Sequence, residues 1–235
     1  ESIRLLYSKA IECGATHICV SDTVGHATPD GAYNVVSFVK GIVGESGAAV
    51  TIDWHGHQDR GLGVANTLAA IAAGAGRVHG CALGIGERCG NTPMDTLLVN
   101  LKLLGIIEHD LTRLPEYVRL ASAMTGIALP VNYPVVGADA YRTATGVHAS
   151  AVVKALAKND LWLANRVYSG VPADWFGLSQ IIEIGPMSGA SNVGYYLQSR
   201  GIVPERALVD KILDAAKRSN RILTESEVMR LTADG

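Results

Sequence analysis

Charged and aromatic residues are both scarce in this chain. Charged side chains make up 18% of it and aromatic side chains 6%, and 20 basic residues against 22 acidic ones leave a net charge of -2. No run of like charges exists, which argues against an electrostatic footprint for nucleic acid. The longest apolar runs are short and broken by glycine or polar residues, which argues against a membrane span. We therefore expect neither nucleic acid nor a membrane as a partner.

Cysteine is also sparse, with four residues and no C-x-x-C pair. This pattern is typical of a reduced, cytoplasmic protein. Two of the cysteines lie in apolar, strand-like runs and are predicted to act as small hydrophobic residues. Glycine, in contrast, is abundant, with 26 residues. That number suits an α/β protein with many tight turns between strands and helices.

Residues 1–128 alternate between helical and strand-like patterns. Strands are predicted at 17–23, 49–55 and 77–83, and helices at 30–44, 62–73, 93–104 and 114–124, with Asp30 as the cap of the first of these helices. Strands separated by helices form a parallel sheet. Three strands form either part of an open sheet or the final strands of an eight-stranded barrel. Because the chain opens within a helical pattern, we favour the C-terminal part of a TIM (β/α)8 barrel whose N-terminal strands are absent.

Residues 129–235 have a different pattern. A linker punctuated by proline, 129–134, leads into a small, mainly helical subdomain. Its helices are predicted near 148–157, 191–200, 205–219 and 225–232. Thr224 and Glu227 have the spacing of a capping box for the last of them.

The segment Trp54-His55-Gly56-His57 carries the most informative pattern. Side chains two residues apart on a strand face the same side, so His55 and His57 project together. At the C-terminal end of a barrel strand they would point into the mouth where barrel enzymes keep their sites. Two imidazoles are suitable ligands for a divalent metal. The alternative is that both are surface residues with no ligand.

Two further loops follow predicted strands. In 84–91, glycines would let the backbone fold over a ligand, with Glu87, Arg88 and Asn91 as polar groups at the same rim. The alternative is a flexible, solvated loop, and the glycine spacing is not that of a dinucleotide-binding fingerprint. After the first strand, Thr23 could donate a hydrogen bond to a carboxylate, whereas Asp22 could only cap the following turn.

Taken in order, these motifs resemble a known family. Asp-Thr-Val-Gly at 22–25, His-Gly-His-Gln-Asp-Arg-Gly-Leu-Gly-Val-Ala-Asn at 55–66 and Gly-Glu-Arg-Cys-Gly-Asn at 86–91 are followed by Thr-Gly-Val-His-Ala at 145–149 and Tyr-Ser-Gly-Val-Pro at 168–172. The pattern resembles the Claisen-condensing branch of the barrel metallolyase superfamily. That branch contains isopropylmalate, homocitrate and citramalate synthases.

The resemblance implies an acyltransferase that condenses acetyl-CoA with a 2-oxo acid and then hydrolyses the thioester, as in leucine biosynthesis. It implies that His55 and His57 bind a divalent metal (Zn, Mn or Mg), which polarises the keto group. The other roles that it implies are substrate binding by Thr23 and Asn91, and catalysis by Glu87, His148 and Tyr168, with the last two in proton transfer.

The family's first strand carries an Arg-Asp pair, whose aspartate is the third metal ligand, and this chain has no counterpart of it. We therefore expect the missing N-terminal strands to come from the same polypeptide or from a partner chain. The resemblance also implies a homodimer in which each helical subdomain reaches the neighbouring barrel. Two alternatives remain: a related barrel lyase that cleaves a hydroxyacyl-CoA, and a non-catalytic partner subunit of a split synthase.

Overall fold

The computed structural model describes residues 1–233, which fold into two compact units. The first comprises Glu1–His109 and Val118–Ile127, and the second comprises Asp110–Tyr117 and the described residues from Ala128 onward. In the described part of the chain, no helix has the length and hydropathy needed to cross a membrane.

The first unit is built on a parallel sheet with the strand order β1-β2-β3. Along the chain its elements are α1 (Ser2–Glu12), β1 (His17–Asp22), α2 (Pro29–Ser46), β2 (Thr51–Gly56), α3 (Gly63–Ala73), β3 (Arg77–Val78), a 3-10 turn (Ala82–Gly84) and α4 (Met94–Leu103). The next helix, α5 (Leu114–Thr125), contributes residues to both units.

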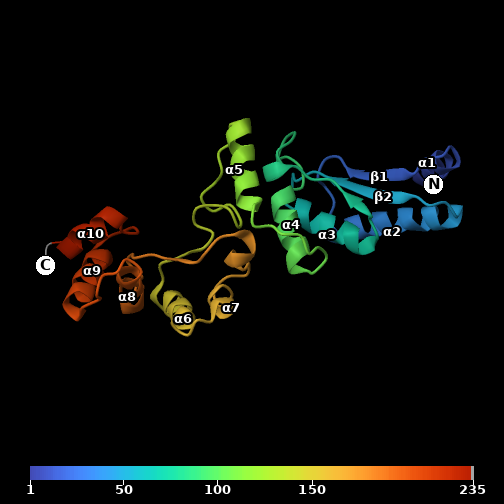
Figure 1. Ribbon diagram of the computed structural model, residues 1–235. Helices are drawn as coiled ribbons and strands as arrows, with labels where there is room; N and C mark the ends of the chain where they lie inside the picture. The colour runs from blue at the N-terminus through green and yellow to red at the C-terminus, as the bar shows by residue number, and fades with distance from the viewer. Residues whose placement is uncertain (234–235) are drawn as a thin grey trace. The chain divides into compact units, whose positions relative to one another are not determined.

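The two faces of this sheet differ in polarity. Ile18 and Val20 of β1 and Trp54 of β2 are buried with residues of α2 and α3, which lie along one face of the sheet (Figure 1). On the other face, β1 presents His17, Cys19 and Ser21, and all three are exposed. Because strand side chains alternate between faces, one face holds the core and the other is polar.

β3 is shorter than predicted. His79 still donates its backbone N–H to the Trp54 carbonyl at 3.0 Å, but Cys81 then pairs with the returning chain, donating to the Thr92 carbonyl at 3.1 Å and accepting from Met94 at 2.8 Å. Leu83 follows with a φ of 57°. The predicted strand end at residue 83 is therefore wrong, because this stretch exchanges its sheet partner for residues 92–94.

Two smaller predictions for the first unit are also wrong. The side chain that caps α2 belongs to Thr28, which accepts from Gly31 N at 3.2 Å, and Asp30 lies inside the first turn. All four cysteines are exposed, including Cys19, which lies on the polar face of β1. Apolar neighbours in sequence did not bury this thiol, because they point to the opposite side of the strand.

The second unit is mainly helical. Its elements are β4 (Arg142–Thr143), α6 (Gly146–Ala157), α7 (Leu161–Ala164), a 3-10 turn (Ala173–Phe176), β5 (Ile181–Ile182), α8 (Ala190–Gln198), α9 (Arg206–Arg218) and α10 (Glu225–Ala233). A buried apolar cluster joins α8, α9 and α10, which lie together in Figure 1. The short parallel pair β4–β5 was not predicted.

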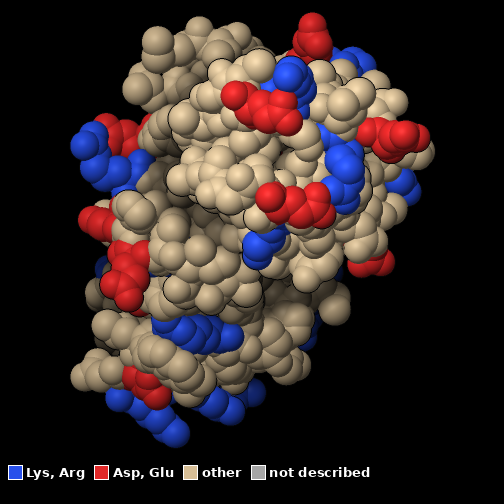
Figure 2. Space-filling view, turned by 90° about the vertical axis from the view of Figure 1, so that its right-hand side faces the viewer, with Lys and Arg blue, Asp and Glu red and all other residues tan. Residues whose placement is uncertain are grey.

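The α/β unit with parallel strands and the mainly helical unit after it agree with the predicted fold class. On the face drawn in Figure 2, acidic and basic side chains are interspersed among uncharged ones.

Candidate functional site

His55 and His57 lie side by side at the end of β2. Their ring centroids are 5.3 Å apart and their planes are nearly perpendicular, at 87°. Both side chains are half-buried. Ser21 of β1 is the register partner of His55, so the pair belongs to the polar face of the sheet.

A backbone carbonyl fixes the tautomer of His57. The Nδ1 atom of His57 lies 3.2 Å from the carbonyl oxygen of Gly90. A carbonyl only accepts, so Nδ1 donates, and in the neutral ring Nε2 keeps a free lone pair. Orientation of a histidine by its second ring nitrogen is typical of metal-binding histidines.

The surroundings of His55 favour its neutral imidazole. Burial lowers the pKa of its imidazole below the ordinary value, and the neighbouring His57 and His79 lower it further. His79 was not singled out in the sequence, yet its ring centroid lies 5.5 Å from that of His55. The neutral imidazole is favoured at this position, and only that form coordinates a metal.

A buried carboxylate lies one step deeper on the same face. Asp53 is 2% exposed. It accepts hydrogen bonds from Arg77 Nε at 3.0 Å and pairs with His17 Nδ1 at 3.3 Å, while His79 Nε2 lies 3.9 Å away. Burial alone would raise the pKa of the Asp53 carboxyl, but the hydrogen bonds from Arg77 and His17 outweigh it and the pKa is lowered.

The sequence contained a signal for this network. On each strand, polar residues recur with the two-residue period of one sheet face. They are His17 and Cys19 on β1, Asp53 and His55 on β2, and Arg77 and His79 at β3. Only the pair His55 and His57 was recognised, because the buried Asp53 and its partners become neighbours only when the three strands align.

The histidine pair fits a metal as two nitrogen ligands. In the chain as described, residues 1–233, no group of three or more His, Cys, Asp and Glu side chains is arranged to hold a metal ion. Further ligands for a divalent ion would have to be oxygen donors from substrate, water or a segment outside this chain.

Thr23 and Asp22 follow β1. The Asp22 carboxylate accepts from the backbone N–H groups of His26 at 2.9 Å and Ala27 at 3.1 Å. Asp22 therefore caps the turn after β1, which was the structural role considered for it in the sequence. Thr23 is exposed, and its carbonyl accepts from Arg88 Nη2 at 2.7 Å.

The loop 84–91 is folded tightly. Asn91 N donates to the Gly84 carbonyl at 2.8 Å, and a Cβ at Gly90, whose φ is +92°, would lie 1.8 Å from that carbonyl oxygen. Asn91 forms a β-bridge with His57, and its side-chain amide donates to the Ile85 carbonyl at 3.0 Å. Glu87 is strongly exposed, with 86% of its side chain accessible.

His148 and Tyr168 are brought together in the second unit. His148 lies in the first turn of α6 and Tyr168 follows α7. Their rings stack with centroids 4.1 Å apart and planes inclined at 29°. Tyr168 is 46% exposed and borders a shallow pocket of about 380 Å³. The first unit holds the histidine pair and the loops of Thr23 and Asn91, whereas this stack belongs to the second unit.

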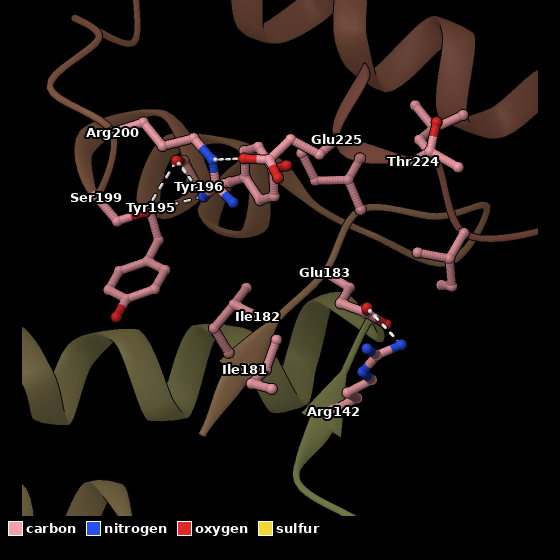
Figure 3. A pocket seen from close by; sticks show the side chains of 13 residues that line it. Arg142, Ile181, Ile182, Glu183, Tyr195, Tyr196, Ser199, Arg200, Thr224 and Glu225 are labelled. Carbon is pink, nitrogen blue, oxygen red and sulfur yellow. Dashed lines mark hydrogen bonds and ion pairs between the residues drawn. The ribbon is translucent and has the colours of Figure 1, made fainter. Parts of the chain in front are cut away.

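A second hollow of the helical unit, of about 550 Å³, lies between β5, α8 and the start of α10 (Figure 3). Its two arginines are already paired. Arg142 Nη1 lies 3.3 Å from Glu183, and Arg200 Nε donates to Glu225 at 3.0 Å. Burial raises the pKa of Glu183, and Arg142 acts against that rise. None of the predicted site residues lines this pocket.

Comparison with known proteins defines the class. Residues 1–121 match the family described as HMGL-like. The chain therefore belongs to the HMGL-like family.

Several of its curated relatives are named as synthases. The chain is 33% identical to the probable 2-isopropylmalate synthase of Methanopyrus kandleri over 90% of its own length and 40% of the relative's. It is 40% identical to the putative (R)-citramalate synthase CimA of Methanothermobacter thermautotrophicus over 65% of its length and 30% of the relative's. It is 32% identical to the homocitrate synthase of Pyrococcus horikoshii over 95% of its length and 58% of the relative's. The chain thus spans roughly a third to somewhat over half of each relative.

Proposed function

We propose that this chain is part of an acyltransferase that condenses acetyl-CoA with a 2-oxo acid. Relatives named as 2-isopropylmalate, citramalate and homocitrate synthases support this reaction class. The observation that carries the proposal is the His55–His57 pair, in which the Gly90 carbonyl orients the ring of His57 and burial lowers the pKa of the His55 imidazole. Leucine biosynthesis in the cytoplasm is the particular setting that we propose.

In this reaction His55 and His57 would hold a divalent ion, Zn, Mn or Mg. When bound, the ion supplies Lewis-acid polarisation of the keto group of the 2-oxo acid. Thr23, on the loop beside the pair, donates a hydrogen bond to the substrate carboxylate, and Asn91 orients substrate from the adjacent loop. Glu87, at the exposed rim, completes the set of polar groups.

His148 and Tyr168 move the protons. The acetyl methyl loses a proton to a base, its carbon bonds to the keto carbon, and the keto oxygen gains a proton. Water then cleaves the thioester and releases CoA. Histidine is the side chain most often used in general acid–base catalysis, and a tyrosine hydroxyl can both donate and accept a proton, so this stacked pair suits the work.

The rest of the barrel would come from N-terminal strands, in the same polypeptide or a partner chain. We further propose a homodimer in which His148 and Tyr168 serve the neighbouring subunit. The related lyase reaction and a non-catalytic role are the alternatives.

Thiol release from acetyl-CoA tests the proposal. The complete protein is assayed with a panel of 2-oxo acids, before and after treatment with a chelator and after restoring Zn²⁺, Mn²⁺ or Mg²⁺. We expect metal-dependent CoA release that requires one of the 2-oxo acids. Cleavage of a hydroxyacyl-CoA without any condensation would favour the lyase, and neither activity would favour the non-catalytic role.

A further inference from the structure

Arg88 lies where the loops that follow the three strands meet. Its Nε donates to Asp59 Oδ1 at 2.8 Å and its Nη2 to Asp59 Oδ2 at 3.2 Å. The same Nη2 donates to the Thr23 carbonyl at 2.7 Å. One guanidinium therefore joins its own loop to the loop after β1 and the loop after β2.

The backbone of Arg88 is strained. Its φ is +57°, a region that non-glycine residues seldom adopt and that costs of the order of 1 kcal/mol or more. Such a conformation persists only where the surroundings determine it. Here the Gly90 N–H closes the loop on the Glu87 carbonyl at 2.9 Å, and the Arg88 side chain is directed to Asp59 and Thr23.

The loops that Arg88 joins are also in close contact. Gly25 has a φ of +58°, and a Cβ there would lie 2.6 Å from the backbone nitrogen of Asp59. Gln58 N donates to the Gly90 carbonyl at 3.0 Å, the same oxygen that accepts from His57. A shift of one loop would therefore displace the groups on the other two.

We propose that Arg88 is a positioning residue that fixes the relative placement of the loops carrying Thr23, His57 and Asn91. This proposal rests on the proposed function, because the proposed function assigns Thr23, His57 and Asn91 to one site. Arg88 touches neither metal nor substrate in this role. It holds the donor for the substrate carboxylate at a set distance from the metal-binding histidine.

An ordinary surface ion pair is the rival explanation. Arg88 and Asp59 are 40% and 26% exposed, and exposed pairs contribute only about 0–1 kcal/mol to stability. The two explanations differ in what the loss of Arg88 changes. A surface pair affects only stability, and a positioning residue affects the affinity for metal and substrate.

The test compares Arg88→Ala, Arg88→Lys and Asp59→Asn in the complete protein. Mn²⁺ affinity is measured by electron paramagnetic resonance, which needs no turnover, and KM for the 2-oxo acid is measured separately from kcat. We expect Arg88→Ala to weaken Mn²⁺ binding about tenfold and to raise KM about tenfold, in the range for residues that orient ligands. Arg88→Lys recovers only part of the loss, because an ammonium cannot make the bidentate contact.

Arg206→Ala is the matched control. Arg206 Nε also donates to a carboxylate at 2.8 Å, that of Asp210, but within α9. We expect unchanged Mn²⁺ affinity and KM for this variant. The proposal is overturned if Mn²⁺ affinity and KM for the 2-oxo acid of Arg88→Ala both stay within twofold of wild type, whatever the melting temperature of the variant. The two proposals can fail separately. If the wild-type protein condenses no 2-oxo acid, the proposed reaction is refuted. If Arg88→Ala still weakens Mn²⁺ binding in that case, the positioning role of Arg88 stands.

Discussion

The His55–His57 pair shows how two neighbouring residues acquire different environments. The Nδ1 of His57 is occupied by the Gly90 carbonyl, whereas His55 lies between His57 and His79. One ring is oriented by a hydrogen bond, and the pKa of the other is lowered by burial and by its neighbours. Both conditions favour coordination of a cation.

Replacing either histidine should separate activity from folding. We expect His55→Ala and His57→Ala to lower metal-dependent CoA release by about 10³-fold, since a metal contributes several kcal/mol to such a reaction. Both side chains are only half-buried, so unfolding free energies should change by about 0.5 kcal/mol or less. Activity and thermal unfolding are measured in parallel. His109→Ala, at an exposed position, is the control, and wild-type activity in either test variant would contradict the site.

The stack of His148 on Tyr168 allows the tyrosine hydroxyl to be tested alone. Tyr168→Phe keeps a ring against His148 and removes only the hydroxyl, so we expect kcat to fall about a hundredfold with unchanged Mn²⁺ affinity. Stopped assays of CoA release and the Mn²⁺ titration give the two values. Tyr33→Phe is the control, because Tyr33 on α2 is also 46% exposed. A Tyr168→Phe enzyme with full kcat would remove the hydroxyl from the mechanism.

The sequence could predict that two residues are neighbours where one element or one motif contains both of them. The two-residue period predicted that His55 and His57 would be neighbours, and the resemblance grouped His148 with Tyr168. Their functional roles stay predictions. The Asp53 network and the contacts of Arg88 could not be predicted in this way. They join residues 24 to 65 positions apart, and only the aligned strands bring them together.

At the scale of elements, the start of α10 is a well-defined local structure. Thr224 N donates to Glu227 Oε2 at 2.8 Å, and Glu227 N donates to Thr224 Oγ1 at 3.4 Å, which confirms the predicted capping box. Arg221 adds two further hydrogen bonds to the Glu227 carboxylate. These contacts from Arg221 and Thr224 hold the pKa of Glu227 well below its ordinary value.

The capping box should therefore make stability depend on pH. Because the folded pKa of Glu227 is depressed, its stabilisation is fully present above the unfolded value of about 4.3 and is lost as the pH falls toward the folded value. We expect Glu227→Gln to lower the melting temperature at pH 7 more than at pH 3. Thermal unfolding at both pH values measures this. Glu205→Gln is the control, since the described structure shows no cap made by that side chain at α9. An equal loss at both pH values would contradict the prediction.

Most helix positions followed from the sequence. The observed α8, α9 and α10 begin and end within about two residues of their predicted limits. Helical spacing of apolar residues is a local property, so it is readable without the fold. The end of β3 and the pair β4–β5 could not be predicted from local spacing, because both depend on partners elsewhere in the chain. Cys81 pairs with residues 92–94, and the backbone around β5 pairs with Tyr141 and Thr143.

At the scale of the whole molecule, the candidate groups are divided between two units. His57 lies in the first and His148 in the second. Mixing a His57→Ala protein with a His148→Ala protein, each complete, tests whether subunits share sites. If they do, each heterodimer has one intact site, and random exchange should restore about a quarter of wild-type CoA release.

Each variant alone and a mixture of two His57→Ala preparations are the controls for this experiment. Subunit exchange is checked independently, with one protein carrying a fluorescent label. No recovery of activity under proven exchange would mean that each subunit builds its site from its own chain.

The division of β1 and β2 into an apolar face and a polar face has an evolutionary consequence. Ile18, Val20 and Trp54 meet α2 and α3, and substitutions among them would disturb packing. On the opposite face Cys19 and Ser21 are exposed, so mutation can alter these positions with less disturbance of the packing. A lineage could therefore change exposed positions of this face one at a time while the buried positions stay fixed.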